Sequence, residues 1–222
     1  MRPVQADGNC SELAPRTHAA ANACGTLVPM SEAERATTTP TTPSNLPVTG
    51  SKVRLRDVTL EDADLLDAWA ADPVAHGEFN DFGTERKPVD RDALAKGPYR
   101  NERNGQLIVE RVDTGAPVGS VGWRKEHYGP TEQSEAWNIG ISLIPAARGL
   151  GFGAEAQRLL ADYLFATTSI DRVEASTDVD NVAEQRSLEK GGFIREGVIR
   201  GAQFRKGARH DLVNFARLRT DE

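Results

Sequence analysis

The chain has 222 residues, a formal net charge of −6 and an isoelectric point near 5.4. This acidic balance argues against a nucleic-acid-binding protein, whose charge footprint is basic, and it permits a cationic substrate. No apolar run approaches the roughly 20 residues that a membrane-spanning helix needs. No positively charged segment precedes an apolar core at the start of the chain, so we expect no membrane association and a cytoplasmic protein.

Residues 1–50 are expected to form a disordered tail, and residues 51–222 a single folded domain. The stretch 37–49 is rich in threonine and proline and cannot bury enough apolar surface to offset the entropy lost on ordering. Cys10 and Cys24 both lie in this tail, without His or Cys partners at ligand spacing. No metal site is therefore predicted.

The domain is predicted to open with a strand over 53–56, where apolar and charged residues alternate. Thr59, followed by Asp62 at the reciprocal capping position, predicts a helix that Asp72-Pro73 ends. The polar segment 74–103 reads as irregular. Three of its residues and one tryptophan further on are candidates for binding a substrate, although a solvated loop explains the segment equally well. These four candidates are His76, Glu78, Asp81 and Trp123.

Strands are predicted over 106–110 and 118–123, joined by a turn, and a further strand opens at about Glu135. In residues 139–143 apolar residues alternate with small or polar ones, and Pro145 ends that strand. An apolar helical stripe then begins at Ala156. Between strand and helix stand Arg148 and three glycines, which are Gly149, Gly151 and Gly153.

A glycine turn at a helix N-terminus favours anions, because the first backbone N–H groups are unpaired and the helix dipole is positive there. Two interpretations of this turn compete with a purely structural one. Gly149-x-Gly151-x-x-Ala154, with Glu174 about 20 residues later, fits a dinucleotide fingerprint, but extra residues separate the strand from the glycines. The second interpretation uses Arg148-x-x-Gly151-x-Gly153.

The rest of the chain predicts a strand over 173–177 and a helix that Asn181 caps and Gly191-Gly192 ends. Two strands follow, over 193–200 and 211–218. A loop containing Arg205, Lys206, Gly207 and Arg209 is expected between them.

The second interpretation of the glycine turn resembles the acetyl-CoA pyrophosphate loop of the GCN5-related N-acetyltransferases, the GNAT superfamily. The similarity covers about residues 52–219 and is carried by 148–156, Asn181 and 187–197. It is closest to the branch of the ribosomal-protein alanine N-acetyltransferases. The resemblance implies an α+β fold, with a mixed, mostly antiparallel sheet of six to seven strands flanked by helices.

The resemblance also implies a function: transfer of acetyl from acetyl-CoA, the co-substrate, to a primary amine without a metal. The amine could belong to a small molecule, such as an antibiotic-type compound, or to a peptide N-terminus, and the enzyme would be a monomer or homodimer. The residues that the family motif assigns to the cofactor are Ile141, Ser142, Leu143, Arg148, Gly149, Leu150, Gly151, Phe152, Gly153, Ala154, Asn181 and Arg186.

Two positions depart from the family pattern. Leu188 stands where many relatives have a tyrosine that protonates the leaving thiolate, and Asn138 stands where many have a glutamate. Glu135 and His127 are the nearest substitutes in sequence for a catalytic base, although a solvated loop also explains His127. These departures leave a non-catalytic acyl-CoA-binding sensor or partner module as the alternative function. The dinucleotide fingerprint leaves a nicotinamide dinucleotide enzyme as a third.

Overall fold

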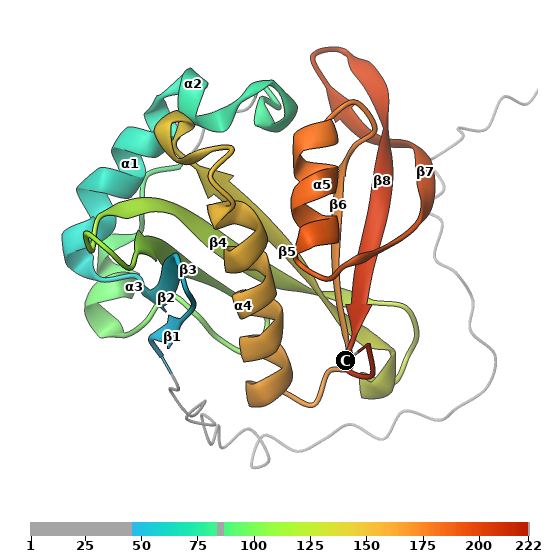
Figure 1. Cartoon of the computed structure of the whole chain (residues 1–222), viewed down its shortest axis with the longest axis horizontal. Helices are drawn as coiled ribbons and strands as arrows, with labels where there is room; N and C mark the ends of the chain where they lie inside the picture. The colour runs from blue at the N-terminus through green and yellow to red at the C-terminus, as the bar shows by residue number, and fades with distance from the viewer. Residues whose placement is uncertain (1–45, 84–86, 222) are drawn as a thin grey trace, which may run out of the picture. The chain divides into compact units, whose positions relative to one another are not determined.

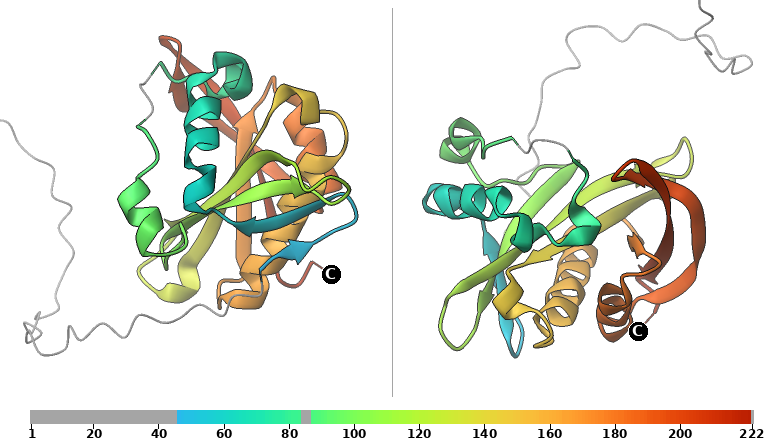
Figure 2. Two further views of the ribbon diagram at one scale, coloured as in Figure 1. Left: turned by 90° about the vertical axis from the view of Figure 1, so that its left-hand side faces the viewer. Right: turned by 90° about the horizontal axis from the view of Figure 1, so that it is seen from above.

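The computed structural model describes residues 46–83 and 87–221, which form one mixed sheet with helices on both faces (Figures 1 and 2). Of the expected tail over residues 1–50, residues 1–45 lie outside the described residues. The strands are β1 (Val48–Thr49), β2 (Val53–Asp57), β3 (Asn104–Arg111), β4 (Pro117–His127), β5 (Glu135–Leu143), β6 (Arg172–Asp178), β7 (Ile194–Arg205) and β8 (Ala208–Leu218). The α-helices are α1 (Ala63–Ala71), α2 (Pro73–His76), α3 (Arg91–Lys96), α4 (Phe152–Thr167) and α5 (Val182–Lys190). The 3₁₀ helices are η2 (Leu60–Asp62), η3 (Glu78–Asn80), η4 (Glu132–Ser134) and η5 (Pro145–Ala147).

The strand order in the sheet is β1-β2-β3-β4-β5-β6-β8-β7, and neighbours are antiparallel except for β5 and β6. These two parallel strands pair at Trp137↔Val173 and Asn138↔Glu174. Beyond Asn138, β5 stays paired with β4 as far as Leu143, but its other edge has no strand partner among the described residues. Figure 1 shows β5 and β6 close together at one end and apart at the other. The sheet therefore opens between them.

Alternation along the strands decides which helices cover which face. Leu107 and Val109 of β3 belong to the main core beneath α4, whereas Ile108 between them packs with α1 and α3 in a second, smaller cluster. Side chains two residues apart point to the same face of a strand, so one strand serves both layers. In the view from above in Figure 2, α4 and α5 lie on one side of the sheet and α1 and α2 on the other.

The predicted α+β fold class is confirmed, and the sheet has eight strands because the chain enters it earlier than expected. Val48 of β1 pairs with Leu55, and Leu46 and Val48 pack against the main core. Two residues of strand carry too little pattern to be recognised in a sequence rich in threonine and proline. The folded part thus begins before residue 51.

Two predicted irregular segments are regular. The loop expected between the last two strands is wrong, because β7 and β8 continue to a tight turn at Lys206 and Gly207. Both residues have positive φ, 51° and 78°, which is the backbone that two-residue hairpins favour. Part of the segment expected to be irregular forms α3, whose first turn is capped by the Asp90 side chain accepting from Ala93 N–H.

Candidate active site

A cavity of about 480 Å³ lies at the end of β5 where this strand is no longer paired with β6. Its walls come from the end of β5, the glycine turn before α4, the first turns of α5, and the segment Gly77–Asn80, which includes η3. The predicted residues that line it are Glu78, Ile141, Ser142, Leu143, Arg148, Gly149, Gly151, Gly153, Ala154, Asn181 and Arg186. The structure therefore brings most of the motif-derived residues together around one cavity.

The glycine turn has the backbone that its residues predict. Gly149 and Gly151 have φ values of 75° and 84°, a left-handed conformation that other residues rarely adopt. Gly153 lies in the first turn of α4 for a different reason. A Cβ at this position would stand 2.9 Å from Ser187 Oγ on α5, so a side chain would close the space between the two helices.

Both helices present their N-terminal turns to this cavity. Gly151, Gly153 and Ala154 line it from α4, and Ala183, Glu184 and Ser187 line it from α5. The Asn181 side chain caps α5 by accepting from Glu184 N–H at 3.3 Å, while its Nδ2 donates to Thr177 Oγ1 at 3.0 Å. Because unpaired N–H groups and positive dipole ends converge here, the cavity is suited to a phosphate-bearing ligand.

Arg148 contacts backbone carbonyls. Its Nε donates to Leu143 O at 3.0 Å, and its Nη2 donates to Ala75 O at 2.6 Å and to Val74 O at 3.3 Å. The side chain therefore ties α2 to the end of β5. The family motif assigns Arg148 to the cofactor, and no local pattern in the sequence indicates these contacts with α2.

A polar cluster links α4 to the face of α5 that lines the cavity. Gln157 of α4 is buried, donates to the Glu184 carboxylate and accepts from Ser187 Oγ at 3.1 Å. Burial raises the pKa of Glu184 to about 7, against a smaller lowering by the Gln157 hydrogen bond. The sequence indicates only a capping role for Glu184. Glu184, Ser187 and Lys190, all cavity residues, follow at intervals of three, and this shared helical face of α5 is the signal that could have grouped them.

Asn138 lies where β5 and β6 part. It pairs with Glu174 of β6 on one side and with Arg124 of β4 on the other, and its side chain is partly buried. Leu188, in place of the family tyrosine, is fully buried in the main core. A side chain at position 188 therefore supports the packing of α5 in this protein.

Glu135 and His127 do not join the cavity. Glu135 opens β5 and His127 ends β4, and the two are paired residues at the far end of these strands. Eight residues of strand separate Glu135 from Leu143, which corresponds to about 26 Å. The Glu135 carboxylate contacts Lys125 Nζ at 2.7 Å and His127 Nδ1 at 3.7 Å, and it lines a separate cavity of about 340 Å³.

Trp123, expected to bind substrate, lies in the core beneath α4. It is 7% exposed and meets Tyr163 edge-to-face, with ring centroids 6.1 Å apart. Odd-numbered residues of β4 such as Trp123 point to the face of the sheet that α4 covers. The sequence alone could not show which face of this strand lies under the helix. Phe152 is likewise buried in the core, with Arg111 over its ring, and Leu150 is half exposed without lining the cavity.

The remaining candidates belong to the segment around η3. Glu78 lines the cavity, whereas Asp81 stands outside it and lies 3.8 Å from Lys206 Nζ at the tip of the β7–β8 hairpin. His76 lies at the end of α2, and its side chain is outside what the structure describes. Phe79, an aromatic residue in a polar stretch of sequence, also lines the cavity.

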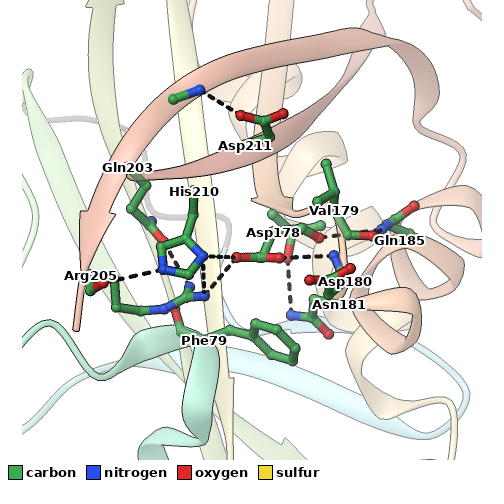
Figure 3. A network of polar contacts seen from close by, with 12 residues as sticks. Phe79, Asp178, Val179, Asp180, Asn181, Gln185, Gln203, Arg205, His210 and Asp211 are labelled. Carbon is green, nitrogen blue, oxygen red and sulfur yellow. Dashed lines mark hydrogen bonds and ion pairs between the residues drawn. The ribbon is translucent and has the colours of Figure 1, made fainter. Parts of the chain in front are cut away.

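A polar network, drawn in Figure 3, connects this segment to β6 and to the hairpin. Arg205 Nη2 donates to Asp178 Oδ2 at 2.6 Å, and Arg205 Nη1 donates to Phe79 O at 3.0 Å. Burial alone would raise the pKa of Asp178, but the Asp180 N–H, Arg205 and His210 outweigh it, so this pKa lies below its usual range. The sequence indicates no role for Asp178 or Arg205.

The sequence profile of the acetyltransferase (GNAT) domain family matches residues 52–194. The chain therefore belongs to the GNAT family of N-acetyltransferases. Within residues 46–83 and 87–221, no helix is long and apolar enough to cross a membrane. In the same part of the chain, no group of three or more His, Cys, Asp and Glu side chains could hold a metal ion.

Two bacterial relatives illustrate the sequence similarity. The chain is 26% identical over 177 residues to the uncharacterized N-acetyltransferase p20 of Bacillus licheniformis, a match that covers 77% of this chain and 94% of that one. It is 29% identical over 113 residues to the uncharacterized N-acetyltransferase YoaA of Bacillus subtilis (strain 168). The second match covers 51% of this chain and spans 62% of the relative's length.

Solved structures share the fold at low identity. The ribosomal L7/L12 alpha-N-protein acetyltransferase RimL, in complex with coenzyme A, has a TM-score of 0.63 and 16% identity over 79% of this chain and 99% of that one. The spermidine N-acetyltransferase of Vibrio cholerae, in complex with coenzyme A and spermine, has a TM-score of 0.61 and 18% identity. This second match covers 78% of this chain and 98% of that one.

Proposed function

We propose that the chain transfers acetyl from acetyl-CoA to a primary amine that carries a positive charge, either a small polyamine-like molecule or a peptide N-terminus. The observation that carries this proposal is the convergence of two helix N-termini and a free strand edge on one cavity. The relatives acting on a ribosomal protein and on spermidine have the same fold and suggest both acceptor classes.

In this proposal the pyrophosphate lies against the glycine turn over 149–154, at the positive end of α4. The pantetheine arm runs along the free edge of β5 at 141–143 and reaches the Asn181 amide. Arg186, which is exposed at the cavity wall, lies near the phosphates. Small residues in the turn, and Gly153 above all, leave the space that such a ligand needs.

The reaction forms a bond between the nitrogen of the neutral amine and the acetyl carbon and breaks the thioester C–S bond. One N–H proton of the amine passes to the departing thiolate, so the products are the amide and the coenzyme A thiol. We propose that Asn138, where β5 and β6 part, contributes a polar group without acting as a base. Catalysis then depends on holding a neutral amine against the thioester, with backbone N–H groups stabilising the oxyanion. Glu135 and His127 are not included, because they lie at the other end of β5.

The acceptor side of the cavity favours a positive charge. The Glu78 carboxylate lines the cavity and attracts a cationic amine at short range. Asp81 contributes less to this field than its sequence position suggests, because Lys206 lies 3.8 Å from it. Attraction by exposed carboxylates weakens as salt is added.

The test has a binding part and a turnover part. Melting temperature is measured with acetyl-CoA, coenzyme A and NAD, since a ligand that binds the native state raises it. Release of free thiol from acetyl-CoA is then followed with spermidine, Ala-Ala-Lys amide and Ala-Ala-Glu as acceptors. We expect stabilisation by acetyl-CoA and turnover of the two cationic acceptors. Stabilisation without turnover of any acceptor would favour the acyl-CoA-binding module, and stabilisation by NAD alone would contradict the proposal.

A further inference from the structure

The wall segment, residues Gly77–Asn80, is held by arginines that come from distant parts of the chain. On its N-terminal side, Arg148 donates to the carbonyls of Val74 and Ala75. At its other end, Arg205 donates to the carbonyl of Phe79, 126 residues earlier in the chain. One arginine precedes α4 and the other ends β7, so the cavity wall depends on both halves of the open sheet.

Arg205 holds Phe79 in two ways at once. Its Nη1 donates to the Phe79 carbonyl at 3.0 Å, and its guanidinium carbon lies 5.4 Å from the centre of the Phe79 ring. Backbone and ring are therefore fixed by the same group. Phe79 lines the cavity, so a change in the position of this residue would change that wall.

Other polar side chains hold the Arg205 guanidinium on the side away from Phe79. Arg205 and Asp178 are 5% and 3% exposed, and they form an ion pair of 2.6 Å. Gln203 Oε1 accepts from Nη1 at 2.9 Å. His210 lies beside the same arginine, as Figure 3 shows, with its Nε2 3.2 Å from the Arg205 carbonyl oxygen and its Nδ1 3.3 Å from Nη2.

This geometry uses what distinguishes arginine from lysine. The two terminal nitrogens of a planar fork divide between Asp178 and Phe79, and the guanidinium carbon lies over the Phe79 ring, 5.4 Å from its centre. A lysine would satisfy the buried carboxylate with one compact charge, but it could not reach the Phe79 carbonyl and cover the ring at the same time. The ion pair alone does not require arginine, whereas the contacts with Phe79 do.

We propose that Arg205 is a positioning residue for the acceptor amine, acting by fixing Phe79 in the wall segment. The inference rests on the proposed function, in which acetyl-CoA occupies the opposite side of the cavity, along β5, the glycine turn and α5. Loosening of the wall segment then changes the binding of the acceptor and leaves the binding of acetyl-CoA almost unchanged.

The kinetic test uses the full chain with Arg205→Lys, and with Arg209→Met as the matched control. Arg209 belongs to the same hairpin, is exposed and donates to the Gly201 carbonyl outside the cavity. With Ala-Ala-Lys amide as acceptor, we expect the acceptor KM of Arg205→Lys to rise about tenfold, while the acetyl-CoA Kd changes by less than about twofold. The control should keep both values.

A second measurement does not depend on turnover. Phe79→Trp places a fluorescent reporter at the ring position, where indole can also stack on a guanidinium. Adding Arg205→Lys to this variant should increase the quenching of its fluorescence by acrylamide, and adding Arg209→Met should not. If the wild type acetylates no acceptor, the proposed function fails, but the quenching result still decides whether Arg205 fixes residue 79.

Folding is checked by melting temperature, because a poorly paired Asp178 would destabilise the protein. If Arg205→Lys does not fold, Phe79→Leu replaces it: the cavity keeps an apolar wall without the ring, and the same rise in acceptor KM is expected. An unchanged acceptor KM would overturn the inference. An equal loss of acetyl-CoA affinity would also overturn it, because the network would then support the whole cavity.

Discussion

The Glu155 carboxylate on α4 accepts a hydrogen bond of 2.8 Å from the backbone N–H of Val53, where β2 begins. The same carboxylate accepts from the N–H groups of Ser51 and Lys52 and from the Ser51 hydroxyl. One side chain in the first turn of the central helix thus provides the hydrogen-bond acceptors for the backbone N–H groups of the turn between β1 and β2. Helix-dipole complementarity, which is what the sequence indicates for Glu155, explains only part of its role.

Glu155→Gln is expected to lower the free energy of unfolding by about 2 kcal/mol or more. Hydrogen bonds to a charged acceptor are lost, and the NH2 group of the new amide faces backbone N–H groups that also need an acceptor. Burial raises the pKa of Glu155, but these hydrogen bonds outweigh it and hold the pKa below its usual value. The stabilisation is therefore present above the pKa of the unfolded chain and is lost as pH falls through the lower folded value. Denaturant unfolding at pH 7 and pH 3 should show a larger difference in stability between Glu155→Gln and wild type at pH 7 than at pH 3. Glu189→Gln, on the exposed side of α5, is the control and should show no difference at either pH.

Gly153→Asp should separate ligand binding from stability. A carboxylate in the first turn of α4 favours the helix dipole, but the new Cβ requires the Ser187 hydroxyl to shift. The free protein should therefore stay folded, with a melting temperature lowered by no more than about a few degrees. The same carboxylate would occupy the space between α4 and Ser187 and repel phosphate, so stabilisation by acetyl-CoA should disappear. Val182→Asp puts the same charge on the first turn of α5 at an exposed position outside the cavity lining, and it should keep most of the stabilisation. Acetyl-CoA binding by Gly153→Asp would contradict the pyrophosphate assignment.

Glu184 should make stability fall between about pH 4.5 and pH 7. Its folded pKa of about 7 lies above the ordinary value, so the native state favours the protonated form. The stability contributed by protonated Glu184 is complete below pH 4.5 and is lost as pH rises through 7. Over this range the free energy of unfolding falls by up to about 1.4 kcal/mol for each pH unit. Glu184→Gln keeps an acceptor for Gln157 and stays neutral. Its melting temperature should match wild type at pH 4.5 and exceed it at pH 8, and an equal difference at both pH values would contradict the buried-acid interpretation.

The rate of acetyl transfer should rise with pH from about 6 to 9, following the unperturbed α-amino pKa near 8 of a peptide acceptor. The reason is that the attacking amine must be neutral and Asn138 provides no base. A pH–rate profile with Ala-Ala-Lys amide at low and high salt measures this rise together with the screening of attraction to Glu78. A profile already flat by pH 7 would reveal a base in the site.

Removal of the N-terminal residues should distinguish two possible starts of the folded domain, Leu46 and Ser51. A chain that begins at Leu46 keeps β1 and should melt at the temperature of the full chain. A chain that begins at Ser51 loses the pairing of Val48 with Leu55 and the packing of Leu46 and Val48, which should cost about 1–3 kcal/mol. That loss corresponds to several degrees in melting temperature for a domain of this size. Equal melting temperatures of the two shortened chains would show that the folded domain begins at residue 51, as the sequence suggests.

Those parts of the fold that depend on local pattern could be predicted from the sequence. The strand over 53–56, the capped start at Thr59 and the helix after Asn181 follow from alternation and capping, and all three are present. β1 could not be predicted, because two residues stabilised by pairing with β2 have no pattern of their own. The full β7–β8 hairpin was missed because its charged tip looks like a loop until Lys206-Gly207 is recognised as a turn.

The site divides in the same way. The glycine turn and Asn181 are local motifs, so their meeting at one cavity could be anticipated from the family pattern. Glu135 is close to Asn138 in sequence, yet in an extended strand every residue adds about 3.3 Å and the side chains alternate in direction. Contacts between residues over a hundred positions apart, such as Arg205 with Phe79, depend on tertiary structure that no local spacing contains.

The incomplete pairing of β5 with β6 has a consequence for which molecules can enter. An unpaired strand edge usually lies at the rim of a sheet, where it can recruit another chain and promote aggregation. Here the unpaired edge after Asn138 lies inside the sheet, with β6 as its next neighbour and the first turns of α4 and α5 close by. A second polypeptide strand with side chains on both faces would collide with these helices. We therefore expect the opening to accept a thin unbranched molecule more readily than a polypeptide strand, and to keep this strand edge from pairing with other proteins.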